Sequence, residues 1–473
     1  APPSVGDRLD RLCSEKSVGA SDTCSRMGLS VLSGTMSADR IDPRLLKGFR
    51  DILPGQEAER QRIMSLLADT FAGFGFVPID TPILEYTEIL LGKGGGETDK
   101  QIFRFEDNGG RDVAMRYDLT VPFARFMAMH LHELYLPFKR FHMAKAFRGE
   151  NTQRGRYREF IQCDFDIVGT DSVSADFEVV LLLQQAFAAM GVSGVTVRLS
   201  HRGLFNEMLA AAGVHENSAE VLRVVDKLHK IGREKVTEEL TALVGTETAA
   251  RVVQFITTSG SNGEILTRLA ELVPSANAHV ERLERLLEMA GANGITGGLV
   301  LDPSITRGLD YYTGIVFETF MDRLPEIGSV CSGGRYDDLA SLYSKEALPG
   351  VGGSIGLDRL MAALEELGAS GAAAPAADTL ILCQDAAHSG EYHRVATALR
   401  AAGVRADVFP DARKLGQQFA TAEKKGIPTA LFVDDEELGT GQVKVRTLAS
   451  RENSEPMLID SAAEFIRSMR VRT

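Results

Sequence analysis

The spacing of apolar and polar positions predicts a chain in which helices and strands alternate over most of the length. Its most informative part is an expected antiparallel hairpin, with strands at residues 139–147 and 160–168 and a polar, glycine-containing turn between them. In the second strand Gln162, Asp164 and Asp166 alternate with apolar residues. Because successive side chains of a strand point to opposite faces, these three polar residues are expected on one face.

The charge of this hairpin allows two interpretations. Between residues 139 and 158 the chain has seven Lys or Arg against one Glu, although its net charge is −13. On charge alone an ordinary solvated face is the simpler interpretation. The alternative is a pocket floored by the sheet, with arginines that bind phosphate oxygens and acids that bind a cationic ligand.

The other elements expected before residue 368 surround this hairpin. Helices are expected at residues 56–73, 121–132 and 171–191, and the stretch 202–295 is helix-rich and is interpreted as an insertion. Strands are expected at 76–79, 101–107, 112–117, 195–200 and within 299–320, with Pro78 indicating a sheet edge. Residues 350–360 predict a glycine-lined strand that enters a helix carrying Arg359.

The two ends of the chain differ from this middle part in composition and residue pattern. Residues 1–35 are Ser- and Gly-rich and are expected to be a loose extension without the pattern of a signal or transit peptide. Order is expected to begin in a domain at 36–368. A small-residue linker at 369–378 then leads to a compact α/β domain at 379–473, in which basic and acidic residues balance.

Composition narrows the class of protein. Hydrophobic content of 44% and charged content of 25% are ordinary for a globular domain, and no apolar run approaches the ~20 residues that span a bilayer. The five cysteines are scattered, which argues against a disulfide framework and favours the cytoplasm. The glycines at 92–99 lack phosphate-loop spacing, so a flexible loop is expected there. Metal ligands are not identifiable.

The remaining polar residues suggest phosphate chemistry. Five arginines are candidates for phosphate binding: Arg148, Arg156, Arg307, Arg335 and Arg359. A second polar set suits a small cationic ligand: Asp118, Thr120, Gln162, Asp166, Tyr311, Tyr312 and Tyr336. Asp118 could instead simply cap the following helix. An enzyme that joins a carboxylate to the α-phosphate of ATP needs positioning and cations rather than covalent help, and these sets meet that need.

Five motifs carry a resemblance to a known family. FRGE at 147–150 with RYREF at 156–160 resembles motif 2 of class II aminoacyl-tRNA synthetases, GGSIGLDRL at 352–360 resembles motif 3, and residues 56–79 resemble motif 1. RGLDYYTG at 307–314 and SGGRYD at 332–337 resemble the two histidine-specific signatures of histidyl-tRNA synthetases. The resemblance covers residues from about 40 to 473. It implies an α/β (α+β) fold: an antiparallel-sheet catalytic domain with a helical insertion, plus a C-terminal α/β anticodon-binding domain.

The resemblance implies a reaction and partners. A member of this family would use ATP, with Mg²⁺ in the substrate complex, to activate L-histidine, and would then transfer it to the histidine-specific tRNA. The family further implies a homodimer, no membrane and no tightly bound cofactor. Two other functions stay open from sequence: a histidine-sensing module like the ATP phosphoribosyltransferase regulatory subunit, and an RNA-binding scaffold.

The resemblance also implies roles for single residues. Arg307 and Arg148 would be catalytic, with Arg148 at the α-phosphate and the histidine carboxylate. The histidine α-amino group would meet Asp118, Thr120 and Gln162, and its imidazole Asp166 and Tyr312, with Tyr311 and Tyr336 closing the pocket. Glu150 and Phe160 would bind adenine, and Arg156 and Arg359 the outer phosphates. Asp118 and Asp166 stand where many bacterial members carry Glu.

Overall fold

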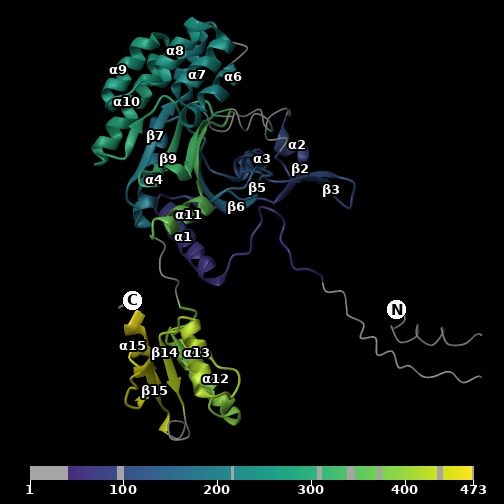
Figure 1. The fold of residues 1–473 in the computed structure, drawn as a ribbon, viewed down its shortest axis with the longest axis vertical. Helices are drawn as coiled ribbons and strands as arrows, with labels where there is room; N and C mark the ends of the chain where they lie inside the picture. The colour runs from purple at the N-terminus through teal and green to yellow at the C-terminus, as the bar shows by residue number, and fades with distance from the viewer. Residues whose placement is uncertain are drawn as a thin grey trace, which may run out of the picture. The chain divides into compact units, whose positions relative to one another are not determined.

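The computed structural model describes residues 41–92, 101–214, 218–305, 312–337, 343, 347–369, 375–433 and 440–470 (Figure 1). Two of the expected site residues, Arg307 and Tyr311, lie outside these described residues. The same holds for the expected extension at 1–35, for most of the glycine-rich segment at 92–99 and for residues 370–374 of the linker at 369–378.

An eight-stranded, mainly antiparallel sheet forms the centre of the first part of the chain. Only the outer pairs β1–β5 and β7–β8 are parallel. The strands follow in this order: β1 (Val77–Pro78), β5 (Phe138–Phe147), β6 (Glu159–Val168), β11 (Gly350–Gly356), β10 (Cys331–Tyr336), β9 (Ile315–Met321), β7 (Val195–His201) and β8 (Leu299–Leu301).

The expected hairpin is confirmed. Strands β5 and β6 pair antiparallel over their full length, from Phe138 opposite Val168 to Phe147 opposite Glu159. Pro78 lies in the edge strand β1, as its missing backbone N–H predicts. Strand β11 then pairs with β6 and carries glycine at four of its seven positions. The hairpin thus lies inside the sheet, with a glycine-rich strand beside it.

One face of the sheet is apolar and is covered by helices. Helices α1 (Pro54–Gly73), α4 (Val173–Ala189) and α11 (Leu357–Glu366) pack on this face (Figure 1). Phe71 of α1 lies 5.6 Å from the ring of Phe141 and 5.2 Å from that of Phe165. Because Phe141 and Phe165 alternate with the polar residues of β5 and β6, the polar residues must point to the opposite face.

A small sheet and a helix stand next to that opposite face. The three-stranded sheet has the order β2 (Leu84–Tyr86), β4 (Asp112–Met115), β3 (Arg104–Glu106). Helices α2 (Thr87–Leu91) and α3 (Thr120–His130) and the turn η3 (Leu131–Glu133) adjoin it. Strand β4 ends two residues earlier than expected. Arg116, which follows it, is buried and donates from Nη1 to the Thr81 carbonyl at 2.6 Å and from Nε to the Lys145 carbonyl at 2.8 Å.

The stretch between β7 and β8 is helical, as its pattern predicted. It consists of α5 (Arg202–Ala211), α6 (Ser218–Val225), α7 (Leu228–Val244), α8 (Thr246–Ile256), α9 (Asn262–Leu272), η4 (Pro274–Ala276) and α10 (Asn277–Ala292). Figure 1 shows α6–α10 gathered in one lobe. Ser261 and Glu264 form a capping box that fixes the start of α9.

The C-terminal part has a sheet and a hydrophobic core of its own. Its five strands follow in the order β13 (Ala406–Val408), β12 (Thr379–Ile381), β14 (Thr429–Phe432), β15 (Gln442–Thr447), β16 (Met457–Leu458). Its helical elements are η7 (Ala386–His388), α12 (Ser389–Ala401), α13 (Leu415–Lys424) and α15 (Ile459–Arg470). This mixture of helices and strands agrees with the α/β pattern expected for this part of the chain. Among the described helices, none is both long and apolar enough to cross a membrane.

Candidate active site

The polar face of the hairpin is buried, so the interpretation of a solvated face is wrong. Arg140 of β5 lies opposite Asp166 of β6, and His142 lies opposite Asp164. These four side chains are between 0% and 3% exposed. Gln162, the next residue on this face of β6, is 8% exposed. Charged groups at this depth must be paired or must meet a ligand, because removal from water is costly for them.

Glycines on the neighbouring strands make room for these side chains. A Cβ atom on Gly352 would lie 2.1 Å from Oδ1 of Asp166, and one on Gly350 would lie 2.5 Å from the ring of Tyr336. On β10, a Cβ atom on Gly334 would lie 2.9 Å from the ring of Tyr312. These glycines of β11 and β10 therefore leave the space that the acid and the tyrosines occupy.

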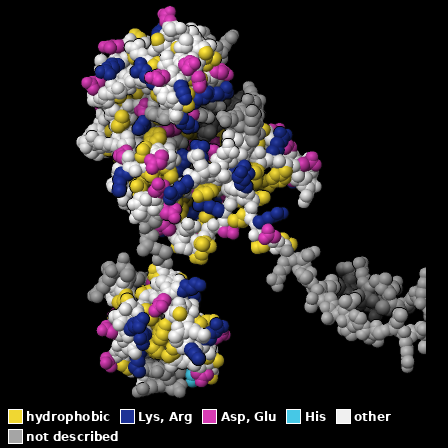
Figure 2. Space-filling view, in the orientation of Figure 1, with side chains coloured by type: hydrophobic (Ala, Val, Ile, Leu, Met, Phe, Trp, Pro, Cys, Tyr) yellow, Lys and Arg dark blue, Asp and Glu magenta, His cyan; other side chains and the backbone are white. Residues whose placement is uncertain are grey.

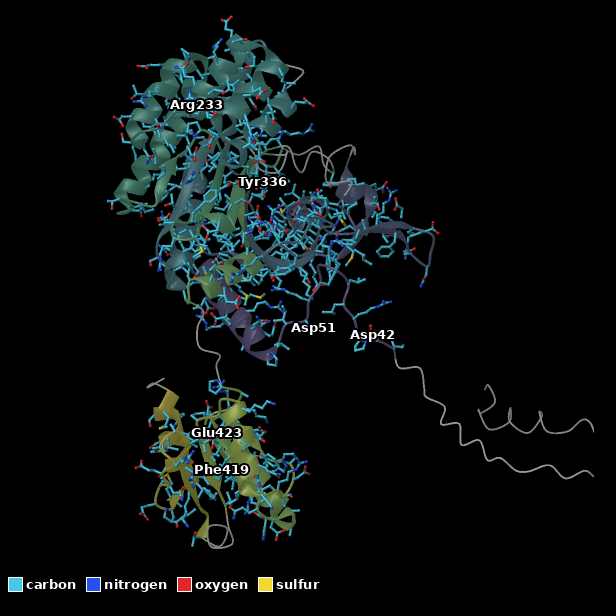
Figure 3. All side chains as sticks on the ribbon, in the orientation of Figure 1. Asp42, Asp51, Arg233, Tyr336, Phe419 and Glu423 are labelled. Atoms are coloured by element: carbon cyan, nitrogen blue, oxygen red, sulfur yellow. The ribbon has the colours of Figure 1, made fainter. Side chains whose placement is uncertain are left out.

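Asp166 is held from two sides. The Tyr336 hydroxyl donates a hydrogen bond to Oδ1 at 2.7 Å, and Nη2 of Arg140 lies 2.7 Å from Oδ2. Arg140 in turn lies over the ring of Phe123, at 4.1 Å from its centroid. Figure 3 shows Tyr336 among the strands of the large sheet. Burial raises the pKa of Asp166, while Arg140 and Tyr336 oppose that shift.

Asp118 contacts the first turn of α3 with one carboxylate oxygen, and the other oxygen has no hydrogen-bond partner among the described residues. Its Oδ1 accepts a hydrogen bond from the backbone N–H of Val121 at 3.1 Å, in the first turn of α3. Its Oδ2 is buried and has no hydrogen-bond partner among the described residues. Burial raises the pKa of Asp118 to about 6, and Arg148 and Arg140 partly offset this effect. Thr120, the first residue of α3, is also buried.

Gln162 and Tyr312 complete the set of polar residues on this face, which we call the acidic slot: Asp118, Thr120, Gln162, Asp166, Tyr312 and Tyr336. Nε2 of Gln162 donates to the Ser354 hydroxyl at 2.8 Å, which leaves its buried Oε1 without a partner in the described part of the chain. Burial raises the pKa of the Tyr312 hydroxyl, and Asp166, Asp164 and Asp118 raise it further. The structure therefore brings together the described residues that were expected to bind a cationic ligand.

Three of the expected phosphate-binding arginines influence one another electrostatically. Nε of Arg148 donates to the Tyr117 carbonyl at 2.8 Å, and its guanidinium lies 5.1 Å from the ring centroid of Phe160. Burial lowers the pKa of Arg359 to about 10, with a further contribution from the positive charges of Arg156 and Arg148. Nη1 of Arg359 donates to the Ser329 carbonyl at 2.5 Å.

The turn of the hairpin holds the remaining expected phosphate and adenine contacts. Nη1 of Arg156 lies 3.1 Å from Oε2 of Glu150, and the Arg156 side chain is 43% exposed. Gly155 approaches Arg359 closely, since a Cβ atom there would lie 3.2 Å from the Arg359 Cα. A cationic region at the turn thus adjoins the acidic slot on the same hairpin.

Arg335 is not part of this site, so its interpretation as a phosphate ligand is wrong. Its side chain is 2% exposed and points to the helix-covered face. There its Nη2 and Nε donate to Oδ1 of Asp176 in α4, at 2.6 and 2.9 Å. Because side chains alternate along β10, Tyr336 faces the slot and Arg335 must face the helices.

Sequence reasoning missed several polar residues on the site face, among them Arg140, His142, Glu318 and Ser354. Ser354 lies opposite Asp164, and Glu318 of β9 lies opposite Ser332. His142 contacts Asp80, with 2.9 Å between its Nε2 and Oδ1 of Asp80. The alternation that singled out Gln162, Asp164 and Asp166 would have found Arg140 and His142 if it had been applied to β5.

Two cavities lie away from this face. One of about 620 Å³ lies in the helical stretch and is lined by Arg233 (Figure 3), and one of about 360 Å³ is lined by His201 and Arg282. Neither is lined by Asp118, Asp166 or Arg148. The polar face is the stronger candidate because its buried acids lack full hydrogen bonding. Among the described residues, no group of three His, Cys, Asp or Glu is placed to hold a metal ion.

Comparison with protein families identifies both parts of the chain. The family model described as histidyl-tRNA synthetase matches residues 48–360, and the model of an anticodon-binding domain matches residues 378–469. The first range contains the motifs on which the resemblance was based, and the second contains the C-terminal α/β pattern.

Individual relatives agree with this assignment. The chain is 47% identical to the histidine–tRNA ligase of Treponema denticola over 90% of its own length and 99% of the relative, and 47% identical to that of Rhodopirellula baltica over 88% and 95%. The crystal structure of histidyl-tRNA synthetase from Nostoc sp. PCC 7120 has a TM-score of 0.81 and 30% identity, covering 91% of this chain and all of that one. This chain belongs to the histidyl-tRNA synthetase family.

Proposed function

We propose that this chain, a histidine–tRNA ligase by family, carries out its chemistry on the polar face of the β5–β6 hairpin. ATP and L-histidine would give histidyl-adenylate and pyrophosphate. The histidyl group would then pass to the 3′ end of the histidine tRNA with release of AMP. The observation that carries the proposal is the buried acidic slot, held by Arg140 and Tyr336, beside a cationic turn on the same hairpin.

The α-ammonium group of histidine would bind at Asp118, Thr120 and Gln162. Oδ2 of Asp118 and Oε1 of Gln162 are buried acceptors without partners among the described residues. Leaving such an acceptor unpaired costs about 1–3 kcal/mol, so a ligand that donates N–H groups would be favoured there. The imidazole would lie against Asp166 and Tyr312, with Tyr336 and Tyr311 closing the pocket.

ATP would bind along the turn of the hairpin. Arg148 would contact the α-phosphate and the histidine carboxylate, while Arg156 and Arg359 would hold the outer phosphates. Mutual repulsion among these arginines would be relieved by the phosphates, because like charges in a partly buried region favour an anion. Glu150 and Phe160 would bind adenine. Arg307 would supply the catalytic cation at the α-phosphate.

The donor set of the described residues fits Mg²⁺ as part of the ATP complex rather than as a protein-held ion. The turn offers arginines, whereas Mg²⁺ prefers carboxylate, phosphate and water oxygens. The ion would neutralise phosphate charge, and Arg156 and Arg359 would orient the oxygens that remain.

The domain division and the partners complete the proposal. The catalytic domain would span 36–368 with its insertion at 202–295, and residues 379–473 would bind the tRNA anticodon. A homodimer is supported by exposed apolar side chains on the small sheet, on α3 and just after η3, including Leu84, Tyr86, Phe105, Met129 and Tyr135. Figure 2 shows hydrophobic side chains at this end of the catalytic part. Sedimentation equilibrium would test the dimer. A cytoplasmic location stays a prediction.

ATP–pyrophosphate exchange, screened over all twenty amino acids, tests the proposal. We expect exchange with histidine alone, because an acidic slot that hydrogen-bonds the imidazole leaves its polar groups unpaired with any other side chain. Exchange that does not depend on histidine would contradict it. Histidine binding without exchange would point to a sensing module. A Bacillus halodurans structure titled as an ATP phosphoribosyltransferase regulatory subunit/histidyl-tRNA synthetase shares the fold, with a TM-score of 0.68 and 24% identity.

A further inference from the structure

The segment that precedes helix α1, residues 47–51, lies against the turn of the hairpin. The backbone N–H of Arg158 donates to the Gly48 carbonyl at 2.9 Å, and Nη1 of Arg158 donates to the Lys47 carbonyl at 3.3 Å. Gly48 has a φ of +88°, and a Cβ atom there would lie 2.7 Å from Cγ of Arg158. Because glycine adopts this conformation without strain and leaves room for the Arg158 side chain, these contacts fix the segment beside the turn.

Arg50, in this segment, contacts both the turn and helix α11. Its guanidinium lies over the ring of Tyr157, at 3.7 Å from the centroid, and its Nη2 donates to Oδ1 of Asp358 in the first turn of α11. The Arg50 side chain is 32% exposed, whereas that of Asp358 is 6% exposed. Oδ2 of Asp358 accepts the backbone N–H of Ile161 at 2.7 Å. Asp358 thereby joins α11 to strand β6, and Arg50 joins both to the turn.

Each partner of Arg50 is next in sequence to an arginine that the proposed function assigns to the outer phosphates of ATP. Tyr157 follows Arg156, and Asp358 precedes Arg359. The positive charge of Arg156 contributes to the lowered pKa of Arg359, so the two guanidinium groups repel one another. A contact that holds residues 157 and 358 together therefore works against this repulsion and limits the distance between the two arginines.

We propose that Arg50 is a positioning residue for the outer phosphates of ATP. By linking Tyr157 to Asp358, it sets the spacing of the two arginines next to them in sequence. This inference rests on the proposed function and deepens it, because it names a residue that acts on the phosphate contacts through its two neighbours. Arginine suits this task because its planar guanidinium can stack on an aromatic ring and donate to a carboxylate at the same time.

The position of the outer phosphates matters for the reaction itself. The carboxylate of histidine attacks the α-phosphorus, and the bond from that phosphorus to the oxygen bridging to the β-phosphate breaks, so that pyrophosphate leaves with the electron pair. The attacking and leaving oxygens must be in line, and catalysis of such a step depends mainly on positioning. A change in the spacing of the phosphate-binding arginines should therefore affect both the binding of ATP and the rate.

The test compares ATP with AMP, which has the adenosine and the α-phosphate but not the outer phosphates. Dissociation constants for both nucleotides, with Mg²⁺ present, are measured by isothermal titration calorimetry on wild type and Arg50→Ala, and kcat and Km by ATP–pyrophosphate exchange. In Arg50→Ala we expect ATP to bind about tenfold more weakly and kcat to fall by about tenfold or more, because small misplacements of reacting groups are costly. The dissociation constant for AMP and the Km for histidine should stay within about threefold of wild type. Equal losses of ATP and AMP affinity, or an unchanged affinity for ATP, would overturn the proposal.

Arg198→Ala is the matched control, because Arg198 also combines an ion pair with an aromatic contact. Its Nη1 lies 3.0 Å from Oδ2 of Asp302, its guanidinium lies 4.9 Å from the ring centroid of Phe320, and its side chain is 38% exposed. Arg198 belongs to β7, near the other edge of the large sheet, so its removal should leave both dissociation constants within about threefold of wild type. An equal loss of ATP affinity in this control would overturn the proposal.

A double-mutant cycle tests the link to Asp358. Asp358→Asn keeps an acceptor for the Ile161 N–H but removes the charge that pairs with Arg50. If the two residues act as one unit, the double variant should bind ATP as weakly as the worse single variant, within about threefold. Effects that multiply would mean that Arg50 does not act through Asp358, and would overturn the proposal.

Folding and function are checked separately, with circular dichroism and denaturation midpoints for the folding of each variant. If Arg50→Ala does not fold, Arg50→Lys replaces it, with the same selective loss of ATP affinity expected because lysine lacks the planar group that stacks on Tyr157. Failure of both variants to fold would make Arg50 a structural residue and also overturn the proposal. Absence of any histidine-dependent exchange in the wild type would instead contradict the proposed function itself, so the two failures can be told apart.

Discussion

At the scale of single residues, Asp118 uses one carboxylate oxygen in the fold, and we propose that the other binds the ligand. One oxygen accepts the Val121 N–H, and the other is buried and unpaired within the described residues. A substitution by Asn keeps an acceptor for Val121 but removes the negative charge. The substitution should therefore weaken ligand binding and leave the start of helix α3 intact.

Asp118→Asn is expected to raise the Km for histidine by about 10–100-fold, because a hydrogen bond between charged groups is worth about 1.5–3 kcal/mol. The Km for ATP should change by less than about threefold. ATP–pyrophosphate exchange at varied histidine and ATP concentrations measures both. An equal rise in the two Km values would argue against a role at the ammonium group.

Glu318 gives a second prediction at this scale, for the pH dependence of stability. Burial raises the pKa of Glu318 to about 7, with Asp226 and Asp302 adding to the effect and Arg359 and Arg198 opposing it. Since the unfolded group titrates near ~4.3, the folded state binds the extra proton between these values. The contribution of Glu318 is therefore present at low pH and is lost as pH rises through about 7.

The stability of Glu318→Gln relative to wild type should then increase with pH, by at most ~1.4 kcal/mol per pH unit. Urea denaturation at pH 5, 6, 7 and 8 measures the difference. Glu284→Gln, at an exposed position of α10, is the control for removal of one carboxylate. A flat profile for both variants would refute the prediction.

At the scale of elements, the glycines of β10 and β11 keep the site open. Gly352→Ala would place a methyl group 2.1 Å from Oδ1 of Asp166 and 2.6 Å from the Phe165 carbonyl. We expect a loss of about 1–3 kcal/mol in the free energy of unfolding from overpacking, together with weaker histidine binding. Thermal or urea denaturation and exchange kinetics measure these effects.

Gly291→Ala provides the matched control for this substitution. Gly291 lies in α10, and a Cβ atom there would meet nothing within 4 Å. Since Ala has the higher helix propensity, this variant should be neutral or stabilised by up to ~1 kcal/mol. If the two variants changed the free energy of unfolding equally, the space beside β11 would not be too small for a methyl group.

Asp176 links three elements and gives a further prediction. Its carboxylate accepts hydrogen bonds from Arg335 of β10 at 2.6 Å and from Arg282 of α10 at 2.7 Å. Asp176→Asn should destabilise the protein by about 3–5 kcal/mol, because it leaves buried positive charge uncompensated. Asp171→Asn is the control: Asp171 contacts the same Arg282 at 3.1 Å but is 69% exposed, so it should cost about 0–1 kcal/mol. Denaturation midpoints distinguish these values.

The elements also show how far the sequence could lead. The hairpin and its polar face followed from alternation alone, because strand periodicity is a local property. The burial of that face did not follow, since it depends on α3 and the small sheet. Arg335 was misassigned because its partner Asp176 is 159 residues away. The cross-strand neighbours of Asp164 likewise depend on a strand order that a single sequence does not state.

At the scale of the whole molecule, the C-terminal part has a hydrophobic core separate from those of the catalytic part. A chain ending at residue 368 should therefore keep histidine-dependent ATP–pyrophosphate exchange within about threefold. Aminoacylation of tRNA should fall by about tenfold or more in kcat/Km, equivalent to the loss of ~1.4 kcal/mol of tRNA binding. Comparison of the two assays on full-length and shortened chains tests this. A parallel loss in both would contradict it.

The long β5–β6 ladder has one more consequence. Asp166, proposed for the imidazole, and Gln162, proposed for the α-ammonium group, lie on the same face of β6 within this ladder, so the ring and the backbone end of a bound amino acid would meet groups on a single rigid frame. The distance between the binding groups on such a frame is fixed. A homologue of histidine with one extra methylene could seat its ring or its ammonium group correctly, but not both, and would be rejected by length although its chemistry is unchanged.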